Sequence, residues 1–256
     1  MTYSNVAVEK HDAVVKLTLS RPEKANALDA TTVTQMLDVL TQAERDESTR
    51  ALILFGAGRH FCAGADLTEL RAGGSDGVRR FLASLRELLM RLERSHLIII
   101  AAVHGAARAG GLELALACDV ILAARSCSFG DAHALIGLIP GAGSTARLPR
   151  AIGWQRAKWM ILSGAPIGAD TALDWGLVID VVDDADLANR AQRFADSFLQ
   201  IHAEVIYRAK GLLAMVSEQP LSASLEAEIT ALQAHYHSAV FQGGIARFLQ
   251  RKNKSF

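Results

Sequence analysis

Two glycine-containing segments of the chain have the composition of a site that binds a reacting carbonyl oxygen. They are residues 63–66, Ala-Gly-Ala-Asp, and residues 109–113, Ala-Gly-Gly-Leu-Glu, and each stands where an apolar run ends and a helix is expected to begin. Small residues let a ligand approach the main chain closely, and the N–H groups at a helix start are unpaired and carry the positive end of the peptide dipole. Two such donors together predict an oxyanion hole.

Glu113 adds a titratable group to the second segment. It stands three residues after Gly110 and about one helical turn along the same face, so it is expected to reach a substrate whose carbonyl is held at that glycine. Its neighbours are Leu112 and Leu114, and burying a charge between them is costly unless the carboxylate has a partner or a task. The alternative is a structural glutamate that pairs with a buried arginine or caps the helix. We favour catalysis, and the pattern predicts an enzyme.

The charge balance points to small molecules as partners. The 256 residues contain 27 Lys and Arg and 27 Asp and Glu, so no overall basic field attracts nucleic acid. The longest apolar run, Leu97–Val103, is too short to span a bilayer. We therefore expect no nucleic-acid partner and no membrane contact, and the length predicts one large domain.

The cysteines and the N-terminus predict a cytoplasmic protein. Cys62, Cys118 and Cys127 lack the spacing of a metal or redox motif, so we expect reduced thiols and no metal site. The first residues, Met-Thr-Tyr-Ser, do not resemble the basic start of a secretory signal.

The predicted elements place both glycine segments after strands. Val6–Glu9 and Ala13–Leu19 favour an N-terminal hairpin, whereas Ala51–Phe55 and Leu97–Val103 predict buried strands ahead of the two segments. Ligands usually bind at the carboxyl ends of strands in open α/β sheets.

The other elements are mainly helical. Residues 81–92 have apolar side chains at helical spacing, residues 141–144 are expected to open another helix, and the pattern is helical from about residue 185. Residues 71–77, Arg-Ala-Gly-Gly-Ser-Asp-Gly, are expected to form a surface loop rather than a lid. A strand-rich front and a helical rear predict the α/β fold class.

Four motifs occur in a fixed order along nearly the whole chain. They are Arg-Pro with Asn-Ala-Leu (21–28), Phe-Cys-Ala-Gly-Ala-Asp-Leu (61–67), Ala-Ala-Val-His-Gly leading into Gly-Gly-Leu-Glu-Leu-Ala (101–115), and Phe-Gly with Gly-Leu-Ile-Pro-Gly-Ala-Gly (129–143). In order and spacing they resemble the crotonase superfamily, the enoyl-CoA hydratase/isomerase family. The resemblance implies a spiral of ββα units in residues 1–200, a helical trimerisation region in residues 201–256, and acyl-CoA substrates. It also implies a homotrimer or a homohexamer built as a dimer of trimers.

The resemblance assigns the two oxyanion donors to the N–H groups of Ala65 and Gly110. Where the family has three consecutive glycines, the first is replaced here by Ala109. This small change leaves the Gly110 amide available if the backbone angles at Ala109 are tolerated.

The resemblance also implies where coenzyme A binds. In the family the adenine and pantetheine groups contact mainly main-chain atoms of the first glycine motif, and a basic residue near the Arg-Pro motif often approaches the nucleotide. Carried over by position, the expected CoA-binding residues are Lys24, Ala63, Ala65, Asp66 and Leu67, with Gly110 at the thioester.

The catalytic pair departs from the family pattern. Glu113 aligns with the first glutamate of the hydratases, which holds the attacking water, but His133 stands where the second glutamate is expected. An imidazole can donate a proton to the α-carbon as that glutamate would, so His133 is either a substitute acid or a residue that lines the pocket. Asp131 could orient the imidazole if both side chains point inward, as alternate residues of an extended segment do.

The leading hypothesis is an enoyl-CoA hydratase that requires no metal or redox cofactor, with coenzyme A present only as part of the substrate. Because of His133, the alternatives are isomerisation, decarboxylation or thioester hydrolysis through the same enolate, or a non-catalytic acyl-CoA-binding protein. The acyl pocket is expected to be formed by regions such as residues 73–85 and 135–142.

Overall fold

The computed structural model describes residues 2–216 and 219–252. The chain divides into two compact units, Met1–Gln200 and Ile201–Phe256. The first unit contains all of the strands of the described residues, and the second is formed by helices.

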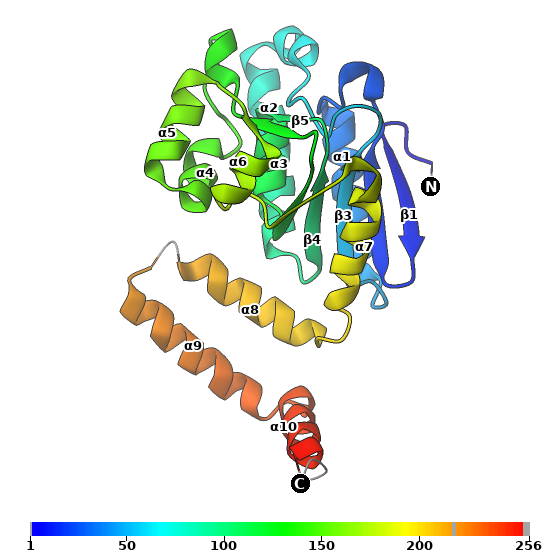
Figure 1. Ribbon diagram of the computed structural model, residues 1–256, viewed down its shortest axis with the longest axis vertical. Coiled ribbons are helices and arrows are strands. Elements are labelled where there is room, and N and C mark those ends of the chain that lie inside the picture. The colour runs from blue at the N-terminus through cyan, green and yellow to red at the C-terminus, as the bar shows by residue number, and fades with distance from the viewer. Residues whose placement is uncertain (1, 217–218, 253–256) are drawn as a thin grey trace. The chain divides into compact units, whose positions relative to one another are not determined.

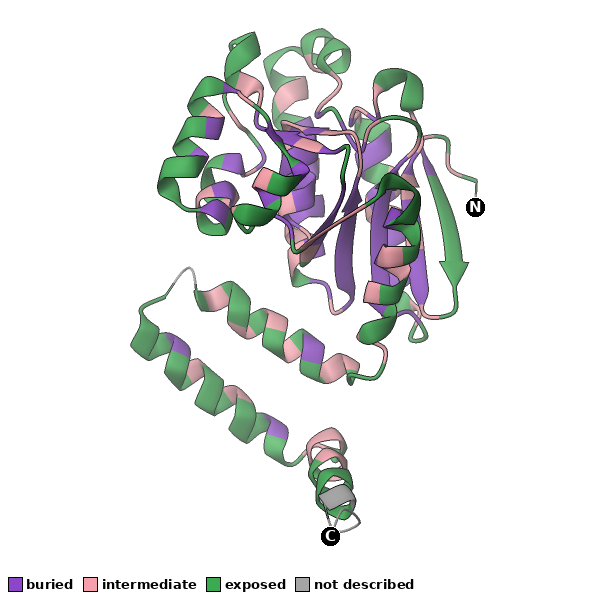
Figure 2. Cartoon of the chain, in the orientation of Figure 1, coloured by how far each residue is buried: buried purple, intermediate pink, exposed green. Residues whose placement is uncertain are grey.

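A six-stranded sheet forms the centre of the first unit (Figure 1). Its strands, in spatial order, are β1 (Val6–His11), β2 (Val14–Leu19), β3 (Ala51–Gly56), β4 (Ile98–Val103), β6 (Val120–Ala124) and β9 (Asp180–Val182). β1 and β2 pair antiparallel, which confirms the predicted hairpin, and the remaining pairs are parallel. β3 and β4 are buried along their whole length, as Figure 2 shows, because apolar side chains occupy both faces of these central strands.

A second, three-stranded sheet lies beside the site. It consists of β5 (Ala106–Arg108), β7 (Ser128–Gly130) and β8 (Ile167–Gly168), and β5 pairs with β7 in parallel. Cys62 forms an isolated parallel bridge with Ala107 of β5. The units β4-β5-α3 and β6-β7-α4 therefore each send one strand into each sheet before a helix follows, which is the predicted ββα spiral.

The helices of the first unit are amphipathic or wholly buried. α7 packs on strands β2, β3, β4 and β6, whereas α3 is buried almost throughout because its sequence is apolar apart from Glu113 (Figure 1). The bounds are α1 Ala30–Arg45, α2 Leu67–Arg94, α3 Gly110–Leu116, α4 Ser144–Ile152, α5 Trp154–Ser163, α6 Ala169–Asp174 and α7 Leu187–Ser197, with the 3₁₀ turns η1 Pro22–Lys24, η2 His133–Ile136 and η3 Asp184–Asp186.

The predicted loop at residues 71–77 is wrong, because this segment belongs to α2. Its residues are exposed or partly so, as expected, but only Gly74 leaves the helical region, with φ 57° and ψ −168°. Apolar residues at helical spacing continue on both sides, so the glycines produce one kink instead of an interruption.

The loop before α1 binds the first glycine segment, because the Ala63 N–H donates to the Ala25 carbonyl at 2.9 Å and the Leu28 N–H donates to the Gly64 carbonyl at 2.7 Å. Ala25 and Asn26 both have a positive φ, 49° and 57°. The side chain of Asn26 donates to the carbonyls of Ala57 and His60, at 2.8 and 2.7 Å, and its oxygen accepts from the Arg21 N–H at 3.0 Å. Asn26 is therefore a buried residue whose side chain fixes the conformation of this loop.

The second unit contains α8 (Ala203–Val216), α9 (Leu221–Tyr236) and α10 (Ala239–Lys252). In its described part, many large apolar side chains are exposed, including Tyr207, Leu213, Leu221, Leu225, Ile229, Leu232, Ile245, Phe248 and Leu249. Such a surface fits the expected role in oligomerisation, which remains a prediction. Across residues 2–216 and 219–252, no helix combines the length and hydropathy needed to cross a membrane.

Replacing Asn26 by alanine is expected to lower the free energy of unfolding by about 2–3 kcal/mol, because it leaves two carbonyls and one N–H without partners and puts a Cβ-bearing residue without a polar side chain at positive φ. Urea unfolding followed by circular dichroism measures the change. Asn189→Ala, on the exposed part of α7, is the control and should change stability by less than about 0.5 kcal/mol. Equal stability of the two variants would show that the Asn26 side chain is dispensable.

Candidate active site

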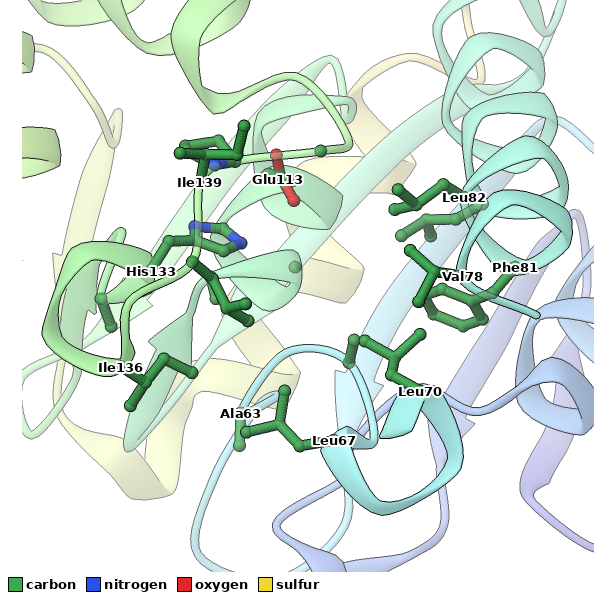
Figure 3. Close-up of a pocket in the computed structure, with 18 of the residues that line it drawn as sticks. Ala63, Leu67, Leu70, Val78, Phe81, Leu82, Glu113, His133, Ile136 and Ile139 are labelled. Atoms are coloured by element: carbon green, nitrogen blue, oxygen red, sulfur yellow. The ribbon is translucent and has the colours of Figure 1, made fainter. Parts of the chain in front are cut away.

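A cavity of about 660 Å³ lies in the first unit, between both glycine segments, α2 and the stretch after β7 (Figure 3). Its lining comes from residues 63–71, 78–85, 109–113 and 132–141. Both halves of α2, on either side of the Gly74 kink, contribute. The regions expected to form the acyl pocket do line this cavity.

The two glycine segments meet at the cavity wall. The Arg108 N–H donates to the Cys62 carbonyl at 2.9 Å, which places the segments side by side. A Cβ built on Gly110 would lie 3.4 Å from the Ala65 nitrogen. Among the described residues, no hydrogen bond uses the N–H of Ala65 or of Gly110, the first residue of α3. The cavity therefore has two neighbouring, unpaired main-chain donors in its lining.

Close backbone packing explains the glycines around these donors. A Cβ on Gly111 would lie 2.2 Å from the Cys62 carbonyl oxygen, so only glycine fits there. Gly64 has φ 107°, and a Cβ on it would lie 3.1 Å from the Cβ of Ala109. Burial raises the pKa of the Cys62 thiol to about 12, so this cysteine is a packing residue and not a nucleophile.

Ala109 adopts a backbone conformation that favours glycine. Its φ is 46° and its ψ is −117°, at the N-terminus of α3. The segment is held by the Ala109 N–H, which donates to the Gly130 carbonyl at 3.0 Å, and by the Glu113 N–H, which donates to the Ala109 carbonyl at 3.0 Å. The replacement of glycine is thus accommodated with backbone strain next to the Gly110 donor.

The carboxylate of Glu113 is buried but hydrogen-bonded. Its residue is only 2% exposed, and Oε1 accepts the N–H groups of Ala142 and Ser144, each at 2.9 Å. These donors lie at the start of α4, where the peptide dipole favours an anion. No hydrogen bond from the described part of the chain reaches Oε2, and the residue lines the cavity. Of the structural alternatives, an arginine ion pair does not occur in the described ranges and α3 has no side-chain cap, but Oε1 does bind two N–H groups at the start of α4.

Arg147 supports the segment that holds Glu113. Its guanidinium donates to the Ala142 carbonyl at 2.7 Å and to both oxygens of Glu93, at 2.6 and 3.0 Å. Sequence reasoning missed this residue, because the pair joins positions far apart in the chain and no motif marks it.

His133, which also lines the cavity, forms a pair with Asp131. His133 Nδ1 lies 2.9 Å from Asp131 Oδ1, the Asp131 side chain is fully buried, and that of His133 is 12% exposed. Burial alone would lower the pKa of His133, but the hydrogen bond and charge of Asp131 and the charge of Glu113 outweigh it and raise the pKa above its ordinary value.

The extended geometry predicted for this pair is wrong. Ala132 has φ 59° and ψ −9°, and a 3₁₀ turn begins at His133. The chain therefore turns back after β7, and the two side chains meet across a turn instead of alternating along a strand.

The remaining predicted residues fall inside and outside the cavity. Ala63 and Leu67 line it, as Figure 3 shows. Asp66 is not among the lining residues, because its carboxylate caps α2 through the N–H groups of Thr68 and Glu69 and pairs with Arg21 at 3.0 Å. Burial opposes ionisation of Asp66, but these bonds prevail and lower its pKa.

Lys24 is exposed on η1 and does not line the cavity. Its expected approach to a nucleotide stays a prediction. Within the described residues, no group of three or more His, Cys, Asp or Glu side chains could hold a metal ion.

Comparisons with known proteins agree with the motifs. The sequence profile of the enoyl-CoA hydratase/isomerase family matches residues 9–256. The chain is 35% identical to the 1,2-epoxyphenylacetyl-CoA isomerase of Escherichia coli (strain K12), over 97% of this chain and 96% of that protein. It is 38% identical to the short-chain-enoyl-CoA hydratase of Clostridium acetobutylicum, over 78% and 77% of the two chains. A crystal structure of an enoyl-CoA hydratase from Bacillus anthracis superposes with a TM-score of 0.91, at 36% identity and 97% coverage of both chains.

Replacing Ala109 by glycine is expected to raise the free energy of unfolding by about 1 kcal/mol, because relief of the positive φ outweighs the extra entropy of the unfolded chain. Ala83→Gly, at an exposed position of α2 with ordinary helical geometry, is the matched control and should lose about 1 kcal/mol. Chemical denaturation of both variants checks the difference. Losses of the same size at both positions would show that residue 109 is not strained.

Proposed function

This chain belongs to the enoyl-CoA hydratase/isomerase family, and we propose that it adds water across the α,β double bond of an enoyl-CoA thioester. It is an enzyme of the crotonase superfamily. The observation that carries the proposal is a single cavity whose lining includes two unpaired main-chain donors, a buried carboxylate and an imidazole.

The thioester oxygen binds at the N–H groups of Ala65 and Gly110. Attack at the β-carbon turns the thioester into an enolate, whose negative charge collects on this oxygen. Two donors already in place stabilise that charge without reorganisation, which is worth several kcal/mol in the transition state. Their proximity, with a Cβ on Gly110 only 3.4 Å from the Ala65 nitrogen, supports a shared target.

Glu113 orients and deprotonates the attacking water. Two N–H bonds on Oε1 hold the carboxylate in place, and Oε2 remains for the water. The hydroxyl oxygen bonds to the β-carbon, the water proton passes to Glu113, and the α-carbon takes a proton from His133. The reaction needs no cofactor besides the coenzyme A of the substrate, because polarisation of the thioester makes the β-carbon electrophilic enough for water to attack.

The acyl group is a hydrocarbon. Leu70, Val78, Phe81 and Leu82 of α2 form one wall of the cavity, and residues 135–141 form another that is mainly aliphatic (Figure 3). Apart from Glu113 and His133, the one charged residue among the described residues of the lining is Arg71, which is exposed on α2. A hydrocarbon chain gains from burial against such walls, whereas a polar acyl end would lose its water without new partners.

Double-bond isomerisation is the second candidate. The family is named for isomerases as well as hydratases, and here an imidazole stands where the second glutamate of the hydratases is expected. The same enolate would form, but His133 would move a proton between carbons and no water would be added.

The proposed assembly follows the family resemblance, and the proposed location follows from the cysteines. We propose a homotrimer or homohexamer held together through residues 201–256, on the strength of the exposed apolar side chains in the described part of that unit. A cytoplasmic setting is supported by the lack of a disulfide bond among Cys62, Cys118 and Cys127, all of which lie in the described residues.

Incubation with crotonyl-CoA is expected to remove the absorbance of the conjugated thioester, and Glu113→Gln should lower kcat at least about 100-fold because the water loses its base. Glu87→Gln, exposed on α2, is the control and should retain full activity. Release of free thiol would show that the enzyme hydrolyses the thioester instead of hydrating the double bond. Tight binding without reaction would identify a non-catalytic acyl-CoA-binding protein.

Gly110→Ala tests the donor pair. The added methyl would make ordinary van der Waals contacts, 3.4 Å from the Ala65 nitrogen and from Gly64, so the fold should persist while the oxygen site becomes crowded. We expect kcat/KM to fall about 100-fold. Gly168→Ala, where a Cβ meets nothing within 4 Å, is the control. Full activity of Gly110→Ala with unchanged circular dichroism would exclude an oxyanion site at this position.

A further inference from the structure

A fully buried carboxylate, that of Asp131, has no part in the reaction as described so far. The residue is 0% exposed. Its Oδ1 accepts from His133, whereas Oδ2 has no hydrogen-bond partner among the described residues. A buried carboxylate is costly unless a cation or several donors compensate it. The imidazole of His133 is the group in contact that can carry a compensating charge.

The backbone geometry fixes the positions of Asp131 and His133 relative to each other. β7 ends at Gly130, whose carbonyl is bound by the Ala109 N–H, so Asp131 leaves the sheet at a fixed place beside α3. The left-handed Ala132 then reverses the chain, and Oδ1 of Asp131 receives both the ring nitrogen at 2.9 Å and the main-chain N–H of His133 at 3.4 Å. The distance between the two side chains is therefore set by a turn.

The contact also decides which ring nitrogen can meet a substrate. An ionised carboxylate only accepts hydrogen bonds, so Nδ1 of His133 carries the proton in that contact. Nε2 is then the nitrogen left for the cavity, which His133 lines. Figure 3 shows the rings and chains of His133 and Glu113 reaching the same cavity from different elements.

The two carboxylates next to His133 favour its protonated form, and the cationic residues nearby lie on α2 and α5. Asp131 lies on the same segment and Glu113 lies on α3, and both act on the ring. Arg71 of α2 lines the cavity. On α5, which packs against η2, Arg156 and Lys158 are exposed and stack on tryptophan rings.

We propose that Asp131 is a positioning residue that, with His133, forms the proton donor of the site in place of a carboxylic acid. This inference rests on the proposed function. The protonated pair is neutral, like a carboxylic acid, and becomes singly negative when Nε2 gives its proton to the α-carbon. Glu113 becomes neutral as it takes the water proton, so the net charge of the three groups is −1 before and after the reaction and zero while the enolate carries the negative charge.

The first test is the titration of His133 by NMR of isotope-labelled imidazole, in the full chain and in Asp131→Asn. Removing the carboxylate removes its attraction for the proton, so the pKa of His133 should fall. The His133→Gln variant assigns the signal. Asp180→Asn is the control and should leave the titration unchanged. It removes a carboxylate that pairs with Arg190 and lies on β9, an outer strand of the six-stranded sheet. An unchanged pKa of His133 in Asp131→Asn would overturn the proposal.

The second test is the pH dependence of crotonyl-CoA hydration in the unchanged protein and in Asp131→Asn. Because the imidazolium is the donor, activity is lost as the pH rises through the pKa of His133, and this limb should move to lower pH in Asp131→Asn. We expect that variant to lose about tenfold more activity near pH 8 than near pH 6. A purely structural role would lower activity equally at every pH, and that result would contradict the proposal.

A double substitution keeps the proposal testable if Asp131→Asn is weakly active. His133→Glu alone sets a second carboxylate beside buried Asp131 and should be nearly inactive, whereas Asp131→Asn with His133→Glu should recover at least about tenfold over it. Additive losses would refute a functional pair. The NMR titration needs no turnover, so a shifted pKa without hydration would leave the pair standing and reject the proposed reaction.

Discussion

The parallel pairing of β5 with β7 is the constraint on which the site depends. Their register ends with Arg108 opposite Gly130, so the chain leaves both strands at the same end of the small sheet. One strand continues into α3 with its glycine start and Glu113, and the other into the turn with Asp131 and His133. The first glycine segment joins them through the bridge between Cys62 and Ala107. Three segments separated in sequence thus converge without long side chains having to span the gap.

The two buried carboxylates of the site are stabilised in different ways, and this difference separates their roles. Glu113 accepts two main-chain N–H groups on one oxygen, and these fixed donors hold the carboxylate in one position. Asp131 instead contacts a titratable ring, so its environment changes when that ring gains or loses a proton. One fixed and one proton-dependent carboxylate at a single cavity are suited to a reaction in which a proton is taken at one point and given at another.

The sequence was most informative where periodicity and motifs agreed. The β1–β2 hairpin, the buried strands β3 and β4, and the helix starting at Ser144 follow from alternation, apolar runs and glycine punctuation, and they are confirmed. The loop predicted at residues 71–77 failed because glycine content outweighed the helical spacing on both sides. The donors to Glu113 could not be predicted from the sequence, because they are main-chain N–H groups about thirty residues away and every residue type except proline has one.

The two departures from the family pattern are neighbours in space. Ala109 replaces a glycine and His133 stands where a glutamate is expected, more than twenty residues later. The Ala109 N–H donates to the carbonyl of Gly130, the residue directly before Asp131. One hydrogen bond therefore joins the residue before the start of α3 to the last residue of β7, directly ahead of the turn that forms the Asp131–His133 pair. This places both changes in one structural unit, on the two segments that follow β5 and β7 of the small sheet.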